Sequence, residues 1–185
     1  MKKISAYLLV TMLLISPVFA DTQTRRVDVT VSGKVYNDML KMWSKYPVTV
    51  FVDSGGLTYV CCNGIFQTQG VLTEALRKKM IDLLNKNIEW CEKSVKGEIE
   101  ITKKLGDLPY NSFSANSLIQ LTFFSANKGK QTDVILSIPD FSNEFIKNDF
   151  YLNQEEVKQL IKALEQVPQT LVELKEQELK AKQLQ

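Results

Sequence analysis

The sequence predicts an α+β domain of two layers, in which an antiparallel sheet built from two hairpins plus flanking strands packs against two amphipathic helices. Two observations lead to this fold class. Runs of β-branched and aromatic residues come in pairs joined by glycine-containing turns, and each pair precedes a long segment with apolar residues at three- and four-residue spacing. Hairpin followed by helix therefore occurs twice, at 48–95 and at 118–166. No linker divides the chain, so we expect a single domain over 21–168 and a charged, helical or frayed C-terminal segment over 169–185.

Residues 1–20 have the pattern of a cleavable secretory signal peptide. Lys2 and Lys3 give a positive start, residues 4–17 are nearly all apolar, and Val18-Phe19-Ala20 offers small residues where a signal peptidase cleaves. The alternative is an uncleaved anchor, but the apolar stretch is shorter than the ~20 residues that a bilayer span needs. We therefore expect a periplasmic or secreted protein with no membrane insertion after cleavage behind Ala20.

The first elements after the signal are interpreted as a strand and a short helix. Polar and apolar residues alternate from Arg25 to Ser32 and stop at Gly33, which predicts a half-buried strand. Apolar residues then recur near helical spacing up to Pro47, which predicts a short helix. These residues are Val35, Met39, Met42, Trp43 and Tyr46.

Two hairpins form the centre of the predicted sheet. Residues 48–53 and 57–62 flank Ser54-Gly55-Gly56, and residues 118–125 and 132–138 flank a turn over 126–130 that contains Asn127-Lys128-Gly129. Glycine and asparagine can adopt the left-handed conformations that tight hairpin turns require. We also expect a strand over 98–102, a turn-rich stretch over 105–116 and a short edge strand over 150–152.

The two long helices have clear start signals. Thr73 is placed as the N-cap of a helix that begins at Glu74 and ends at Gly97. Its apolar stripe consists of Leu76, Met80, Leu84, Ile88, Cys91 and Val95. The second helix follows a capping box formed by Asn153 and Glu156, and Pro168 is expected to interrupt it.

Composition excludes several function classes. Without Lys2 and Lys3 the chain has 21 basic and 21 acidic residues, so no large basic field is left to attract nucleic acid. The chain contains no histidine, which removes Ser-His-Asp and Cys-His catalysis and histidine-ligated zinc. No glycine-rich nucleotide loop or metal motif is present, so we expect no cofactor and no metal. The acidic residues Asp133, Asp140, Glu144 and Asp149 do not match a calcium loop and are interpreted as solvated charges.

The three cysteines predict a disulfide in an oxidising compartment. Cys91 lies on the predicted helix, and Cys61-Cys62 end a predicted strand, so one of the two can bridge to Cys91. A bridge that closes a loop of about 30 residues is worth about 3 to 4 kcal/mol in the loop-entropy model. Neighbouring strand residues point to opposite faces, and the more apolar row of Leu57, Tyr59 and Cys61 slightly favours Cys61. The remaining thiol is either passive or links two chains in a homodimer, which can also be non-covalent.

With these classes removed, the main hypothesis is an exported, non-enzymatic protein that binds another macromolecule. Its partner would be a protein outside the cytoplasm, and its role that of a toxin-immunity or inhibitor protein or of an envelope-assembly factor. The candidate contact residues are those of the two hairpin loops, Ser54, Gly55, Gly56, Asn127, Lys128 and Gly129. The alternative hypothesis is a small exported hydrolase that uses paired carboxylates or a Ser-Lys dyad.

Overall fold

The chain has an α+β fold with one curled antiparallel sheet and two helices. The computed structural model describes residues 23–37, 40–63, 67–109, 118–139 and 147–184. The predicted signal peptide over 1–20 lies outside these residues. The elements are β1 (Thr24–Arg26), β2 (Val31–Asn37), β3 (Met42–Asp53), β4 (Thr58–Asn63), β5 (Gln67–Leu72), α1 (Glu74–Gly97), β6 (Ile101–Pro109), β7 (Leu118–Ala126), β8 (Gln131–Pro139), β9 (Lys147–Asn153) and α2 (Gln154–Lys182). Neither helix combines the length and the apolar character needed to cross a membrane.

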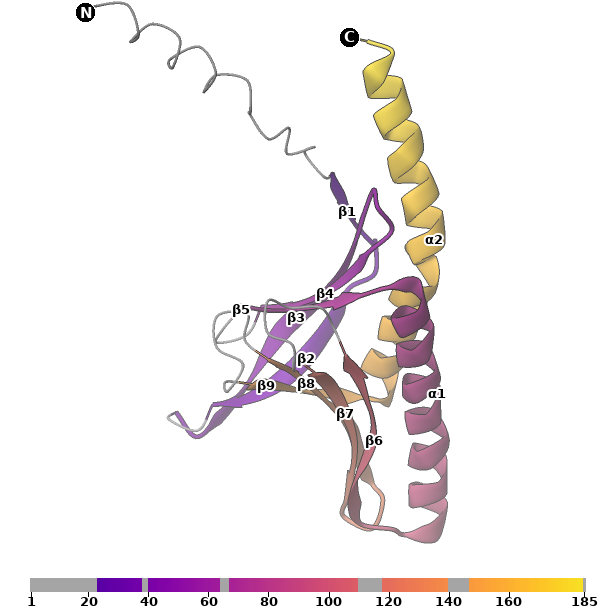
Figure 1. Ribbon diagram of the computed structural model, residues 1–185. Helices are drawn as coiled ribbons and strands as arrows, with labels where there is room; N and C mark the ends of the chain where they lie inside the picture. Colours follow the sequence, from indigo (N-terminus) through magenta and orange to yellow (C-terminus); the bar gives the residue numbers. More distant parts are fainter. Residues whose placement is uncertain (1–22, 38–39, 64–66, 110–117, 140–146, 185) are drawn as a thin grey trace, which may run out of the picture.

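The molecule consists of two halves with the same order of elements, four strands followed by a helix. The first half contains β2 to β5 and α1, and the second contains β6 to β9 and α2. The strands lie in the order β5-β4-β3-β2-β9-β8-β7-β6, so β2 and β9 join the halves in the middle of the sheet. The two helices lie side by side against the curled sheet (Figure 1).

The curl of the sheet brings β5, at one end of the strand order, against strands of the other half. Strand β5 contacts β8, and a Cβ at Gly70 of β5 would clash with the side chain of Ile119 on β7. Glycine at this position therefore permits the close approach of the two strands. The largest fully buried side chains, which form the centre of the core, are Phe123, Phe150, Leu72, Met80, Leu84, Leu108, Ile119, Leu121, Leu136, Ile138, Leu152 and Leu160.

Both predicted hairpins are confirmed. Strands β3 and β4 pair from Val48↔Cys62 to Val52↔Thr58, and β7 and β8 pair from Gln120↔Ser137 to Ala126↔Gln131. The turns of both hairpins contain the glycines from which they were predicted. The predicted short edge strand over 150–152 is part of β9, but β9 lies between β2 and β8 and is therefore not an edge.

The predicted short helix over residues 35–46 is wrong, because this segment forms the β2–β3 hairpin. The two strands pair continuously from Val31↔Val48 to Asn37↔Met42. The spacing of the apolar residues fits a helix, but it also fits a hairpin, in which Val35 is buried and Met42 and Trp43 are exposed. The Asn37 side chain accepts a hydrogen bond from the amide of Leu40 at 3.0 Å, which is the chemistry of a turn.

Two strand boundaries also differ from expectation. The predicted strand over 25–32 is split into β1 and β2, which pair with the same edge of β3 and are separated by a local turn in which the Val29 amide donates to Val27. Gly33 lies inside β2 rather than at its end. Strand β6 begins at Ile101 and runs into the stretch expected to be turn-rich, whose remaining residues, 110–116, lie outside the described ones.

Helix α1 begins and ends as predicted, but the face that it buries is different. Thr73 caps the first turn, and the last helical residue is Gly97, followed by Glu98 in a left-handed conformation. Val95 of the predicted stripe is exposed, whereas Arg77, Asn87 and Ser94 are buried. The buried face thus includes polar residues, of which Arg77 bonds to α2 and Ser94 to Ser125 of β7.

Pro168 does not interrupt α2, and the cause is a contact from α1. A proline lacks the amide that would donate to the carbonyl four residues earlier, which here belongs to Leu164. The guanidinium Nη1 of Arg77 donates to this carbonyl at 2.7 Å, and Arg77 is only 6% exposed. The first half of the molecule therefore supplies the hydrogen bond that the proline removes from the second half.

Candidate functional site: an aromatic surface on the sheet

Four aromatic rings form a continuous cluster on one face of the sheet, which we call the aromatic surface. The ring centroids of Tyr36 and Trp43 are 5.2 Å apart, those of Trp43 and Tyr151 4.9 Å, and those of Tyr151 and Phe124 6.4 Å. The last two pairs are edge-to-face, a favourable geometry for aromatic rings. The cluster spans four strands, because these side chains come from β2, β3, β9 and β7.

The exposed end of the aromatic surface lies on the β2–β3 hairpin. Trp43 is 50% exposed and Tyr36 38% exposed, whereas Tyr151 and Phe124 are half-buried. Leu40 and Met42, near the tip of the hairpin, are also exposed. An exposed apolar group with tryptophan and tyrosine at its centre is typical of protein-binding surfaces.

Lysines lie beside the aromatic rings. Lys34 pairs in register with Lys45 on β3 and with Tyr151 on β9. Two like charges directly opposite each other on neighbouring strands disfavour folding. Lys45 is paired with Glu156 at 3.7 Å, but no carboxylate among the described residues forms an ion pair with Lys34.

Burial and two neighbouring carboxylates raise the pKa of the Tyr151 phenol. Burial is the larger cause, and Asp149 and Asp133 add to it. Asp149 also accepts a hydrogen bond from Ser137 at 2.5 Å. A phenol is neutral at physiological pH, and the raised pKa of Tyr151 moves its ionisation further from that range.

The predicted contact residues Ser54, Gly55 and Gly56 form the turn between β3 and β4. The Ser54 amide donates to the carbonyl of Gln23, and Gly56 has a φ of 88° and lies near Leu171 of α2. The turn therefore contacts Gln23, just before β1, and Leu171 of α2. Gly56 is needed for the conformation of the turn. The role of the turn in partner contact stays a prediction.

The predicted contact residues Asn127, Lys128 and Gly129 form the turn between β7 and β8, and all three have positive φ. The Lys128 amide donates to Glu100 at 2.7 Å, and a Cβ at Gly129 would clash with the carbonyl of Ser94. This turn is packed against the end of α1. Its role in partner contact also stays a prediction.

The cysteines Cys61, Cys62 and Cys91 are free in the structure. Cys62 belongs to the buried row of β4, whereas Cys61 is half-buried on the opposite row together with Tyr59. The apolar row that favoured Cys61 is thus not the row that faces the core. Burial raises the pKa of each of the three thiols. A bridge from one of the first two to Cys91 stays a prediction.

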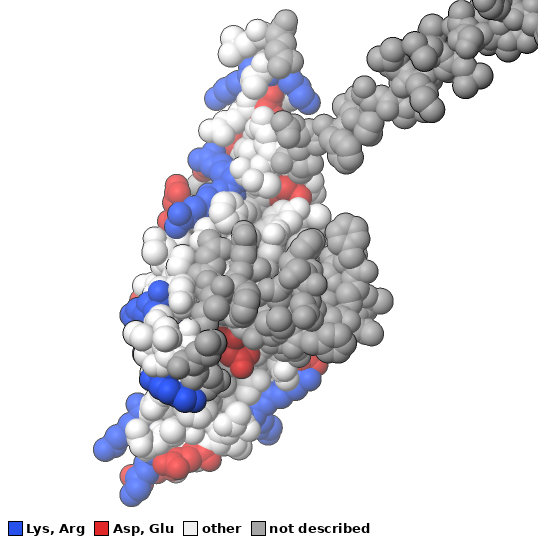
Figure 2. Space-filling model, turned by 90° about the vertical axis from the view of Figure 1, so that its left-hand side faces the viewer, with Lys and Arg blue, Asp and Glu red and all other residues white. Residues whose placement is uncertain are grey.

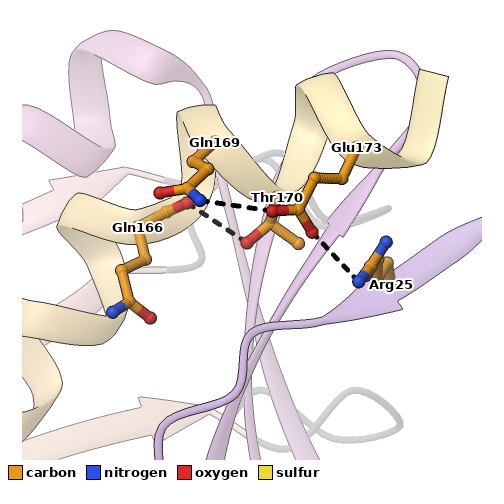
Figure 3. A network of polar contacts seen from close by, with 5 residues as sticks. All are labelled: Arg25, Gln166, Gln169, Thr170 and Glu173. Atoms are coloured by element: carbon orange, nitrogen blue, oxygen red, sulfur yellow. Dashed lines mark hydrogen bonds and ion pairs between the residues drawn. The ribbon is translucent and has the colours of Figure 1, made fainter. Parts of the chain in front are cut away.

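A polar pocket lies between β1 and the second part of α2 (Figure 3). It has a volume of about 170 Å³. Glu173 pairs with Arg25 at 3.0 Å and accepts from Gln169 at 3.3 Å, while Thr170 donates to the carbonyl of Gln166. Asp28 lines the same pocket, so two carboxylates, Asp28 and Glu173, share its lining. Catalysis by paired carboxylates stays a prediction.

The acidic residues do not gather into a metal site in the described part of the chain. No group of three or more aspartates, glutamates or cysteines is placed there to hold an ion. Asp133 and Asp149 lie on β8 and β9, and Asp140 and Glu144 lie outside the described residues. Figure 2 shows lysines and arginines interspersed with acidic residues on the face in view, rather than one broad field of either sign.

Sequence reasoning missed the aromatic surface because it placed Trp43 and Tyr46 on one short helix. The usable signal was the alternation of Tyr46, Val48, Val50 and Val52 with other residues, which has a period of two. The pairing of Tyr36 with Trp43 depends on the register of the hairpin, which no local pattern reveals. The contact with Tyr151 depends on the order of the strands.

Comparisons with known proteins assign no family. No protein-family description matches the sequence, and no curated protein matches it. Among solved structures, SsgB of Streptomyces coelicolor, a protein whose mutations correlate with longitudinal cell division during sporulation, superposes with a TM-score of 0.38 and 8% sequence identity. The superposition covers 77% of this chain and 86% of that one. At this level of similarity it carries no argument about function.

Proposed function

We propose that this chain is an exported, non-enzymatic protein that acts by binding another protein outside the cytoplasm, either as a toxin-immunity or inhibitor protein or as an envelope-assembly factor. The observation that supports this proposal is the aromatic surface. Trp43 keeps half of its surface exposed although Tyr36 and Tyr151 pack against it. Tryptophan and tyrosine held rigidly on strands lose little side-chain entropy on binding, which is why they dominate the energetics of interfaces.

The arrangement of the rings also limits the kind of partner. The half-buried rings of Tyr151 and Phe124 support the exposed ones from behind, so Tyr36 and Trp43 present a preformed platform. Lys34 beside this platform supplies a charge that has no ion pair among the described residues. A complementary surface would therefore offer an apolar group for the rings and a carboxylate or carbonyl oxygen for Lys34.

The test compares affinity baits made from the chain beginning at Asp21. The baits are the unaltered chain, Trp43→Ala, Trp43→Phe, and the matched control Val172→Ala, which removes an equally exposed apolar side chain from α2. Periplasmic extract and the secreted proteins of rival strains serve as sources of partners. We expect a stoichiometric partner that binds the control normally and binds Trp43→Ala about thirtyfold more weakly, because a central tryptophan contributes about 2 kcal/mol or more.

The conservative variant separates a contact role from a role in stability. Trp43→Phe keeps an aromatic ring on the platform and should recover most of the affinity. Equal binding by Trp43→Ala and the unaltered chain would refute the aromatic surface as the contact. The absence of any stoichiometric partner from either source would refute the proposed function itself.

A further inference from the structure

A second binding feature lies away from the aromatic surface, where the end of α1 meets β6. It is a groove with a volume of about 180 Å³. Its lining residues are Trp90, Lys93, Ser94, Ile99, Ile101, Lys103 and Phe123. The ring centroids of Trp90 and Phe123 are 5.7 Å apart in an edge-to-face arrangement, while Ile99 and Ile101 are 45% and 41% exposed at the rim. The groove therefore offers apolar surface that the folded chain leaves uncovered.

The charged residues that line this groove are all lysines. The ammonium groups of Lys86 and Lys103 each lie 5.1 Å from the centre of the Trp90 ring, and Lys93 lines the groove as well. None of the lining residues is acidic. The nearby carboxylates of Glu98 and Glu100 are engaged by the side chain and the amide of Lys128. A ligand seated here would meet positive charge beside an apolar floor.

The groove runs along a free edge of the sheet. Strand β6 is the last strand in the order, so only β7 pairs with it among the described strands. Residues 101–104 are exposed, and the regular register ends at the irregularity between Lys104 and Gly106. Beyond it, the carbonyl of Asp107 accepts from Lys79. The available edge is therefore a short one, and Ile101 and Lys103 lie on the same face of it.

We propose that this edge and groove together bind an extended acidic segment of a partner protein. The segment adds a strand to β6, places one apolar side chain against Trp90 and Phe123, and directs carboxylates toward Lys93 and Lys103. The volume fits a single side chain, since pockets for drug-sized molecules begin at about 300 Å³. Lys103 and Lys104 disfavour the same edge of a second copy, because like charges would then face each other. This inference does not depend on the proposed role of Trp43.

The experiment measures peptide binding through the fluorescence of Trp90. The chain contains two tryptophans, so Trp43→Phe leaves Trp90 as the only one. The probe is a capped hexapeptide in which glutamates flank a central leucine. We expect it to change the Trp90 fluorescence on titration and to slow hydrogen exchange of the β6 amides over 101–104. Two control peptides carry lysines in place of the glutamates or alanine in place of the leucine, and both should bind at least tenfold more weakly.

Variants of the chain test the same contacts from the other side. In the Trp43→Phe background, the double substitution Lys93→Gln with Lys103→Gln should weaken binding of the acidic peptide about tenfold, as the loss of two partly exposed ion pairs predicts. Lys180→Gln, an exposed charge on α2, should have no effect. Binding that ignores the two lysines, equal binding of either control peptide, or unchanged exchange along β6 would each overturn the proposal. A chain that already dimerises through this edge and is not competed by the peptide would also overturn it.

Discussion

The hairpins β3–β4 and β7–β8 occupy equivalent places in the two halves, but their turns are held in different ways. In the first, Asp53 accepts hydrogen bonds from the amide of Leu57 at 2.8 Å and from the hydroxyl of Tyr59 at 2.6 Å, so its side-chain support is local, although the Ser54 amide also donates to the carbonyl of Gln23. In the second, the side-chain support comes from Glu100, which accepts from the Lys128 amide and lies 28 residues away, and Gly129 lies against the backbone of Ser94. Hydrogen bonds between residues close in sequence can be predicted from the sequence. The contacts of the β7–β8 turn with residues 94–100 depend on the fold.

The two helices repeat this contrast. Helix α1 begins at its own N-cap, Thr73, and ends one residue before the left-handed Glu98. Helix α2 also starts from a local capping box, but its passage through Pro168 relies on Arg77 of the other half. Each half thus contains locally supported elements, while the second half also depends on groups that the first half provides.

The largest expected effect comes from breaking this dependence at Arg77. Arg77→Met keeps the apolar stem but leaves the carbonyl of Leu164 without a donor, which should cost about 3 kcal/mol in the free energy of unfolding. In the Pro168→Ala background the helix supplies its own amide, so the same substitution should cost at least 1 kcal/mol less, on the order of known coupling energies between contacting residues. Urea unfolding of the four chains of this cycle measures the coupling.

A control separates the hydrogen bond from the charge of the arginine. Lys78→Met removes a neighbouring exposed charge of α1, which pairs with Glu74 of the same helix, and should change stability little. If Arg77→Met lowers the free energy of unfolding equally with proline and with alanine at position 168, the contact with Leu164 does not explain the continuity of α2.

A smaller effect should separate the two turns. Gly56 and Gly129 both have positive φ, at 88° and 75°. A Cβ at Gly56 would meet only Leu171 at 3.5 Å, an ordinary contact, but at Gly129 it would clash with backbone. We expect Gly56→Ala to cost about 1 kcal/mol, from the left-handed backbone alone, and Gly129→Ala about 2 kcal/mol or more. Thermal or urea unfolding measures these losses of stability. If Gly56→Ala and Gly129→Ala lower the free energy of unfolding equally, the two turns are supported in the same way.

The smallest effect concerns the local support of the first turn at high pH. Burial and the hydrogen bond to Asp53 raise the pKa of Tyr59 from 10.0 to about 12. The folded state therefore favours the protonated phenol, and this stabilisation is complete below pH 10 and is lost as the pH rises through about 12. Asp53→Asn should lower the pKa toward 10 without reaching it, because burial remains.

The measurement follows phenolate absorbance in the unaltered chain and in Asp53→Asn, with Tyr59→Phe subtracted from each to isolate Tyr59. An unchanged titration in Asp53→Asn would mean that the carboxylate does not hold the phenol in solution. The corresponding turn of the second half contains no tyrosine and therefore adds no phenolate signal to this measurement.

Local signals predicted much of the fold. Glycine turns, β-branched runs and helix caps gave both central hairpins and the starts of both helices, because the forces that set them act within a few residues. The β2–β3 hairpin was misread since its apolar residues satisfy two periods at once, and the continuation of α2 was missed since its cause is Arg77. The aromatic surface and the groove at Trp90 combine residues from strands far apart in sequence, so only the strand order reveals them.

The junction of β2 with β9 has a consequence for the order of folding. Every other pair of neighbouring strands along the main path of the sheet consists of consecutive elements and can form through a short loop, but Lys34↔Tyr151 joins opposite ends of the described chain. The entropy of closing so long a loop delays this pairing until the rest of the structure is in place. During synthesis the edge of β2 therefore stays open while the second half emerges, and strand edges of this kind attract other chains. A chain with this strand order needs its last strand to protect its first hairpin.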